Sequence, residues 1–163
     1  MELQNLRDLF VEELADLYSA ETQLVEAIPL MAQAASSTEL RNSFQTHLGQ
    51  TQNQINRLEQ IFSQLGVSPS NKTCKGMRGI ISEAQETIKE NGNPNVKDAA
   101  LIAQAQRVEH YEIAGYGSVR TYAQQLGENR AAELLQQTLN EEAETDKKLT
   151  QLAVEIVNAK AGS

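Results

Sequence analysis

The sequence predicts an all-α protein in which long helices pack into a bundle. Ala, Leu, Gln and Glu dominate the 163 residues, and these are residue types that favour helices. Aromatic residues make up only 4% of the chain, and its 9 glycines and 3 prolines are confined to a few places. Apolar residues recur at helical spacing over four long stretches. We therefore expect helices throughout the chain.

The first two long stretches predict a helical hairpin. An apolar stripe through residues 6–31 ends at the polar run Ser36-Ser37-Thr38, and a second stripe follows through residues 40–65. Thr38 is the predicted N-cap of the second helix, because its hydroxyl can accept a hydrogen bond from a free helical N–H group. Gly66 is the predicted C-cap, because glycine adopts the left-handed conformation that ends many helices.

A crossover and a second hairpin complete the expected fold. Residues 66–96 are interrupted by glycine and proline and contain a shorter amphipathic piece at residues 80–88. The third stripe runs through residues 102–126 to Gly127, and the fourth runs through residues 131–156. Two hairpins joined by a connection of about thirty residues indicate a ferritin-like four-helix bundle with one long crossover, which carries an additional short helix.

Length, charge and cysteine content narrow the class of protein. The length suits a single domain, so we expect residues 1–163 to form one helical-bundle domain. A net charge of -8 argues against a nucleic-acid or anionic-membrane partner, since both require a basic face. Cys74 is the only cysteine, and the sequence shows neither a signal peptide nor a membrane span. We therefore expect a cytoplasmic protein.

Each of the four long segments places a polar residue on or beside its apolar stripe. Glu21 stands in the first stripe where a core residue is expected, and His47 lies beside the second. Glu109 and Glu112 repeat this feature in the third stripe, and Glu142 does so in the fourth. Because desolvating a carboxylate costs several kcal/mol, buried carboxylates rarely lack a partner. These residues therefore need something that compensates their charge.

The distances of these residues from the two short turns indicate that they share one layer. Glu21 precedes the first turn and His47 follows it, and at about 1.5 Å per residue we expect the two to lie in the same part of the bundle. Glu112 and Glu142 are related in the same way across the second turn, to within roughly a helical turn. No Lys or Arg lies on these stripes. A divalent metal held by carboxylates and imidazole is therefore the expected partner.

The same residues are also compatible with ordinary structural roles. The glutamates can be charges at the edge of the bundle, and His47 can be a surface or core histidine bonded to a neighbour. Tyr116 lies one turn from Glu112, where it can pack in the core or donate a hydrogen bond to a ligand. Gly115 and Gly117 suggest close approach by another helix or by a dimer partner.

Four stretches of sequence carry a resemblance to a known family. They are "DLYSAETQL" in the first helix, "HL" followed by Thr51 in the second, "DAALIAQAQRVEHYEIAGYG" in the third and "TLNEEAETDKKLTQLA" in the fourth. With these stretches, the chain resembles the YciF-like family of bacterial stress proteins over nearly its whole length. The resemblance implies a ferritin-like bundle, a homodimer, a di-iron-type site and a role in stress responses.

The resemblance also implies a set of metal ligands. The matching positions are Glu21, His47, Glu109, Glu112, Glu142 and Asp146. Gly49 and Gln50 stand where the family carries acidic residues, so we expect Gln50 to coordinate through its amide oxygen. The chain contains no Glu-x-x-His motif. The expected cofactor is iron, or else manganese, with two ions at full occupancy.

Three functional hypotheses follow. The first is a ferritin-like di-iron or di-manganese protein of stress defence that reacts with dioxygen or peroxide, for example as an oxidase or a peroxide scavenger. The second is a non-catalytic homodimeric interaction protein with a degenerate metal site, which Gly49 and Gln50 favour. Mineral storage in a cage is a weaker third, because the sequence shows no shell-forming interface.

Overall fold

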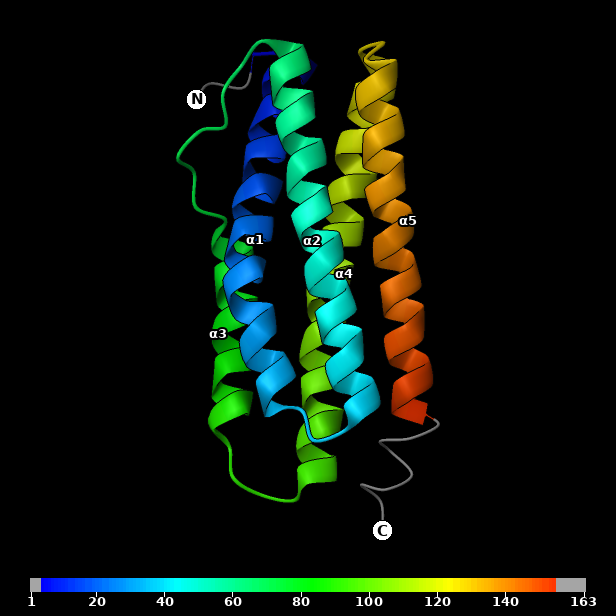
Figure 1. The fold of residues 1–163 in the computed structure, drawn as a ribbon. Coiled ribbons are helices and arrows are strands. Elements are labelled where there is room, and N and C mark those ends of the chain that lie inside the picture. Colours follow the sequence, from blue (N-terminus) through cyan, green and yellow to red (C-terminus); the bar gives the residue numbers. More distant parts are fainter. Residues whose placement is uncertain (1–3, 155–163) are drawn as a thin grey trace.

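The computed structural model describes residues 4–154, and all of its regular secondary structure over this range is helical. The elements, shown in Figure 1, are α1 (Leu6–Ala34), α2 (Thr38–Leu65), α3 (Lys75–Lys89), α4 (Pro94–Gln125) and α5 (Asn129–Leu152). The predicted all-α class is therefore confirmed. The predicted fourth stripe extends to Ile156, which lies outside the described residues. No helix within residues 4–154 is long and apolar enough to span a bilayer.

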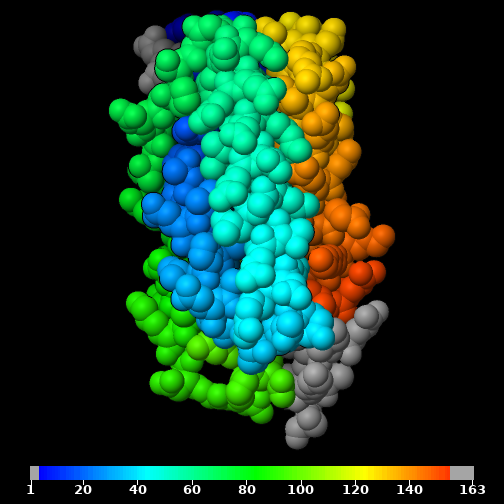
Figure 2. Space-filling view, viewed as in Figure 1, coloured from blue at the N-terminus to red at the C-terminus, as the bar shows by residue number. Residues whose placement is uncertain are grey.

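Two antiparallel hairpins, α1–α2 and α4–α5, form the bundle. Helix α1 packs against α4 and α2 packs against α5, so the two hairpins join along both pairs. Helix α3 belongs to the crossover and lies on the outside against α1 and α4, as Figure 1 shows. This arrangement confirms the ferritin-like bundle with one long crossover and an additional short helix. Figure 2 shows α2 and α5 side by side on one face.

The helix ends agree with the expected turn chemistry, with one shift of register. Gly66 ends α2 with φ 68°, as predicted for a left-handed C-cap. The N-cap of α2 is Ser37 rather than Thr38, because the Ser37 hydroxyl accepts the hydrogen bond from the Leu40 N–H at 3.3 Å. The prediction for Thr38 was therefore wrong by one residue. Pro94 begins α4, where its missing N–H would have no helical partner.

Asp98 ties the crossover to the turn of the first hairpin. It lies in the first part of α4, and its side chain accepts hydrogen bonds from the backbone N–H groups of Ser36 and Ser37 at 2.8 and 2.7 Å. The Ser36 hydroxyl donates a third hydrogen bond at 2.7 Å. A buried carboxylate with three donors stabilises the N-terminus of α2, where free N–H groups favour negative charge.

The apolar core is divided into two clusters along the bundle. One cluster includes Leu24, Met31 and the inward residues of α3, and the other includes Phe10, Leu14 and the inward residues near the α4–α5 turn. Between them lie the polar residues that the stripes of the sequence placed inward. The bundle is therefore apolar at both ends and polar near its middle.

Gly115 and Gly117 have different surroundings. A Cβ atom at Gly115 would lie 2.7 Å from Cδ2 of Leu17, so the Leu17 side chain of α1 occupies the space that a larger residue would need. A Cβ at Gly117 would meet nothing within 4 Å. Gly115 thus permits close packing of α1 on α4 within the chain, as expected for a glycine approached by another helix.

Candidate metal centre

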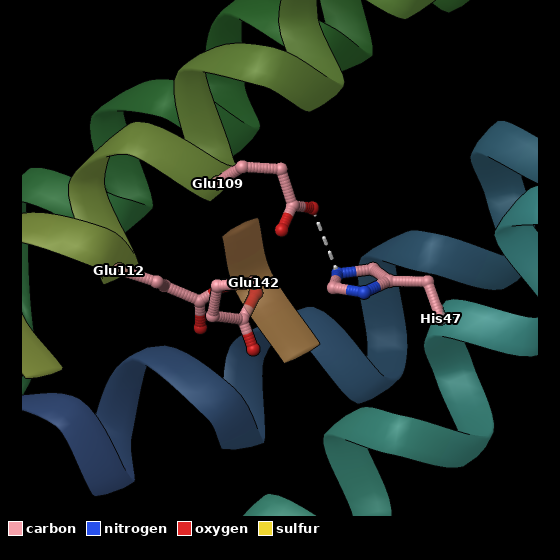
Figure 3. A group of neighbouring side chains, drawn as sticks. All are labelled: His47, Glu109, Glu112 and Glu142. Atoms are coloured by element: carbon pink, nitrogen blue, oxygen red, sulfur yellow. Dashed lines mark ion pairs between the residues drawn. The ribbon is translucent and has the colours of Figure 1, made fainter. Parts of the chain in front are cut away.

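Four side chains from three helices converge in the middle of the bundle. His47 comes from α2, Glu109 and Glu112 come from successive turns of α4, and Glu142 comes from α5. Each offers one ligand atom, and these atoms all lie within 4.8 Å of one another. Figure 3 shows the three carboxylates and the imidazole facing a common centre. We refer to these four residues as the central cluster.

All four residues are shielded from solvent. Glu112 and Glu142 are 0% exposed, Glu109 is 1% exposed and His47 is 5% exposed. This burial excludes the interpretation that the glutamates are charges at the bundle edge. The local reason is the helical repeat, because each residue occupies a position of the apolar stripe of its own helix.

Most atoms of this layer lack a hydrogen-bond partner. Within residues 4–154, ten buried side-chain nitrogen and oxygen atoms have none, and seven of them belong to Glu21 and the central cluster. Both oxygens of Glu112 and both ring nitrogens of His47 are among the seven. His47 Nε2 lies 3.2 Å from Glu109 Oε1, within ion-pair distance but not aligned as a hydrogen bond. Buried polar groups are normally paired, so this concentration makes the layer a candidate ligand-binding site.

The electrostatic environment opposes charge on these groups. Burial raises the pKa of Glu112 well above its ordinary range, and the charges of Glu21 and Glu142 add to the effect. Burial, followed by the neighbouring Glu142, likewise raises the pKa of Glu109 and of Glu21. Burial lowers the pKa of His47 and so favours its neutral form, which has a free lone pair. A dication would oppose the shifts of the three carboxyl groups by stabilising their ionised forms, and it would favour the neutral form of His47 further.

Glu21 adjoins the central cluster from α1. It is 0% exposed, and the hydroxyl group of Tyr116 donates a hydrogen bond to its Oε1. Its other oxygen, Oε2, is buried without a partner. Tyr116 is therefore a hydrogen-bond donor to a predicted ligand as well as a core residue. Tyr18 lies one turn before Glu21 on α1, but its hydroxyl donates a hydrogen bond to Glu59 near the surface.

Two predicted ligands lie outside the central cluster. Gln50 Oε1 accepts a hydrogen bond from the hydroxyl of Thr145 at 3.3 Å, across the α2–α5 seam. Asp146 Oδ1 lies 3.2 Å from His110 Nε2 and accepts a hydrogen bond from Gln106 at 3.1 Å. Coordination by Gln50 and Asp146 stays a prediction, whereas the structure shows these protein partners for both.

Sequence reasoning missed one buried polar residue on α2, Gln54, and named Thr51 without assigning it a place at the site. Gln54 is 0% exposed and its amide donates hydrogen bonds to Glu141 and Glu142. Thr51 is also 0% exposed, and its hydroxyl has no partner. A helix turns by about 100° per residue, so Gln54 lies only about 20° from the direction of His47 and Gln50 about 60°. That comparison of directions was the signal available in the sequence.

The donor set suits a hard or borderline divalent metal. Carboxylate oxygens with one or more imidazole nitrogens are typical ligands of iron, manganese and zinc in proteins. The central cluster offers three carboxylates and one neutral imidazole, and Glu21 offers a fourth carboxylate beside it. The residues present therefore fit a divalent ion.

Comparison with known proteins places the chain in a family. The model of DUF892, a domain of unknown function, matches residues 5–162. The chain belongs to this family. It is 46% identical over 162 residues to protein YciF of Escherichia coli (strain K12), in an alignment that covers 99% of this chain and 98% of that protein. The resemblance to the YciF-like family is confirmed.

Solved structures agree with this assignment. The crystal structure of the E. coli stress protein YciF matches with a TM-score of 0.92 and 46% identity, covering 95% of this chain and 98% of that chain. YcfI from Rhodopseudomonas palustris, described as a candidate structural protein, matches with a TM-score of 0.90 and 41% identity, covering 94% and 98%. A protein from Xanthomonas campestris, at 21% identity and a TM-score of 0.77 over 97% of each chain, shares the fold.

Proposed function

We propose that this DUF892 protein binds divalent iron or manganese in its central cluster and uses the metal in stress defence, in reactions with dioxygen or peroxide. The observation that carries the proposal is the set of buried, unpartnered oxygen and nitrogen atoms of Glu21, His47, Glu109, Glu112 and Glu142. YciF, which is 46% identical, is described as a stress protein, and this supports the physiological part of the proposal.

The chain's own residues have distinct roles in this proposal. A bound iron or manganese ion would supply redox chemistry at the site. His47 offers a neutral ring nitrogen, while Glu109, Glu112 and Glu142 offer negative charge. Tyr116 orients Glu21 by donating a hydrogen bond to one of its oxygens. The burial of all these groups excludes bulk water, which strengthens every charge interaction in the site.

Metal titration of the purified protein tests the proposal. A ligand that binds only the folded state stabilises it, by about 2.7 kcal/mol when its concentration is 100 times the dissociation constant. We expect Mn(II), or Fe(II) without oxygen, to raise the melting temperature of metal-free protein. Glu112→Gln should reduce the rise, and Glu144→Gln, which removes an exposed glutamate from α5, serves as the matched control. An unchanged melting temperature in the unaltered protein would contradict the proposal.

A homodimer in the cytoplasm is a second part of the proposal, supported by family membership alone. Gly117 faces open space, which leaves room for a second chain on α4. Multi-angle light scattering measures the mass directly. A monomeric mass at tens of micromolar protein, roughly, would contradict a stable dimer.

A non-catalytic interaction protein is the competing function. The hydrogen bond from Thr145 to Gln50 favours an interaction protein. Gln50 stands where the family carries an acidic residue, and here its side chain makes a structural contact. The description of YcfI as a candidate structural protein points the same way. Elemental analysis of protein purified without chelator separates the two functions, since a degenerate site would retain less than one equivalent of metal.

A further inference from the structure

Gln54 stands between the central cluster and a surface ion pair. It lies on α2, two helical turns after His47, and is completely buried. Its Nε2 donates one hydrogen bond to Oε2 of Glu141 at 3.1 Å and a second to Oε1 of Glu142. Both acceptors belong to adjacent residues of α5. One amide group therefore joins a residue of the central cluster to the next carboxylate on the same helix.

The chemistry of these partners determines the orientation of the Gln54 amide. A carboxylate can only accept hydrogen bonds, and the amide nitrogen has two hydrogens to donate. The nitrogen must therefore face Glu141 and Glu142, and both of its hydrogens are used. The amide oxygen of Gln54 is buried and has no partner. A flipped amide would place two carboxylates against an acceptor, which is unfavourable.

Arg57 fixes the outer end of this chain of contacts. Its two terminal nitrogens bind both oxygens of Glu141, at 2.7 and 2.6 Å, and one of them also donates to the Thr138 hydroxyl at 3.1 Å. Two parallel bonds between a guanidinium and a carboxylate give a rigid, charge-assisted pair. The pair is only partly exposed, at 18% and 26% for the two side chains. Glu141 is thus held in one position and provides a fixed acceptor for Gln54.

Glu142 is constrained as a result. Its Oε1 is engaged by Gln54, and its Oε2 is buried without a partner. The same carboxylate contributes to the group of ligand atoms that lie within 4.8 Å of one another. One oxygen is therefore held by the protein while the other is free to bind an ion.

We propose that Gln54 is a positioning residue of the metal centre, which holds Glu142 so that it binds a metal through a single oxygen. Arg57 and Glu141 complete the arrangement by fixing Gln54. Hydrogen bonds to metal-binding side chains orient them and tune their affinity, and losing such a bond lowers metal affinity by about 10- to 100-fold. This inference rests on the proposed function, because it requires a metal in the central cluster.

Cobalt(II) binding to the full-length protein tests this role, because the visible absorption of cobalt reports its coordination number and geometry. The variants are Gln54→Leu, which removes both donated hydrogen bonds, and Gln54→Asn, which keeps an amide on a shorter side chain. Gln60→Leu is the matched control, since Gln60 is exposed on the same helix. Affinity is measured by competition with a chelator of known strength, and circular dichroism monitors folding.

We expect Gln54→Leu to weaken Co(II) binding by about 10- to 100-fold and to alter the absorption spectrum, because Glu142 can then rotate and bind through both oxygens. The Co(II) affinity of Gln54→Asn should lie between that of Gln54→Leu and that of the unaltered protein. Gln60→Leu should have the affinity and the spectrum of the unaltered protein. Arg57→Met should alter the spectrum in the same direction with a smaller loss of affinity. If Gln54→Leu is unfolded, the folded Gln54→Asn variant decides.

Two results overturn the inference in distinguishable ways. If the unaltered protein binds Co(II) and both Gln54 variants keep its affinity and spectrum, the positioning role is wrong and the metal centre stands. If the unaltered protein binds no Co(II), the proposed function and the positioning role fail together.

Discussion

Asp98 and Glu112 are both buried carboxylates on α4, and they differ in what surrounds their oxygens. Asp98 is 2% exposed and accepts three hydrogen bonds from Ser36 and Ser37. Glu112 is 0% exposed, and neither of its oxygens has a hydrogen-bond partner. The two side chains are therefore equally buried. The oxygens of Asp98 accept hydrogen bonds, whereas those of Glu112 do not. The unsatisfied oxygens, rather than burial, distinguish a candidate ligand position from a structural one.

The difference between the two carboxylates has an energetic meaning. The hydrogen bonds to Asp98 offset the cost of removing its charge from water, so that side chain stabilises the folded state. No N–H or hydroxyl group donates to Glu112, whose neighbours include the carboxyl group of Glu21, so we expect its ionised form to raise the free energy of the metal-free fold. A bound dication would provide the missing compensation. The following substitutions test this difference, from the largest expected effect to the smallest.

Asp98→Ala should give the largest loss of stability. It leaves the N–H groups of Ser36 and Ser37 without their acceptor and removes negative charge from the N-terminus of α2. Losing hydrogen bonds to a buried charged group should lower the free energy of unfolding by about 3 kcal/mol. Urea denaturation followed by circular dichroism measures it. The loss should be the same with chelator or with excess metal, and a loss that metal abolishes would contradict a purely structural role.

Glu112→Gln should act in the opposite direction on the metal-free protein. Removing a buried carboxyl group that lacks hydrogen bonds should raise the free energy of unfolding by about 1 kcal/mol in the presence of chelator. Stabilisation by added Mn(II) should be reduced in the same variant. A variant that is destabilised in chelator would show that Glu112 is satisfied in the metal-free protein, and the contrast with Asp98 would be lost.

The effect of Glu112→Gln should depend on pH. Burial raises the folded-state pKa of Glu112 well above its ordinary value of 4.5, and the charges of Glu21 and Glu142 add to this. Its contribution to stability is therefore fully present below the unfolded-state pKa and is lost as pH rises through the folded-state pKa. Metal-free wild type should thus lose stability relative to Glu112→Gln as the pH rises above 4.5. Thermal melts in chelator at several pH values measure the difference, and a constant difference would contradict the raised pKa.

Asp146→Asn should have the smallest effect. Asp146 is partly exposed and contacts His110 and Gln106, and surface pairs of this kind contribute less than about 1 kcal/mol. We expect a change in stability of at most about 0.5 kcal/mol and a change in Mn(II) affinity of no more than about twofold. Isothermal titration calorimetry measures the affinity. A larger loss of affinity would show that Asp146 moves to the metal and acts as the ligand that the family resemblance implies.

Local patterns in the sequence were sufficient to predict the fold. The 3.6-residue repeat defines the long helices, and Gly66 ends α2 because its left-handed conformation is a local property. The layer at Glu21, His47 and Glu112 was predictable because the position of a residue along an antiparallel helix pair follows from its distance in sequence to the shared turn. The N-cap of α2 was misassigned to Thr38, since Ser37 and Thr38 both carry a hydroxyl that can cap.

Contacts between distant residues could not be predicted. Asp98 binds residues of the first turn that lie 61 and 62 positions away, and no local pattern links them. Gln54 was missed because its neutral amide carries no charge that needs a partner, although its direction on α2 is close to that of His47, and its partner Glu142 lies 88 positions away. Gln50 was expected at the metal from its place after His47, whereas its direction on α2 leads it to Thr145. Which inward residues are satisfied by hydrogen bonds depends on tertiary structure.

The packing of Leu17 on Gly115 also bears on how an ion reaches the interior. A Cβ at Gly115 would lie 2.7 Å from Cδ2 of Leu17, so α1 and α4 are in close, apolar contact near the site, which is unfavourable for the passage of a hydrated ion. The opposite seam, between α2 and α5, is joined at this level by polar pairs such as Gln50–Thr145 and Arg57–Glu141. Of these, the Gln50–Thr145 hydrogen bond joins two neutral groups at 3.3 Å and can be exchanged for bonds to water at small cost. We therefore expect an ion to enter between α2 and α5 rather than through the closely packed contact of α1 with α4.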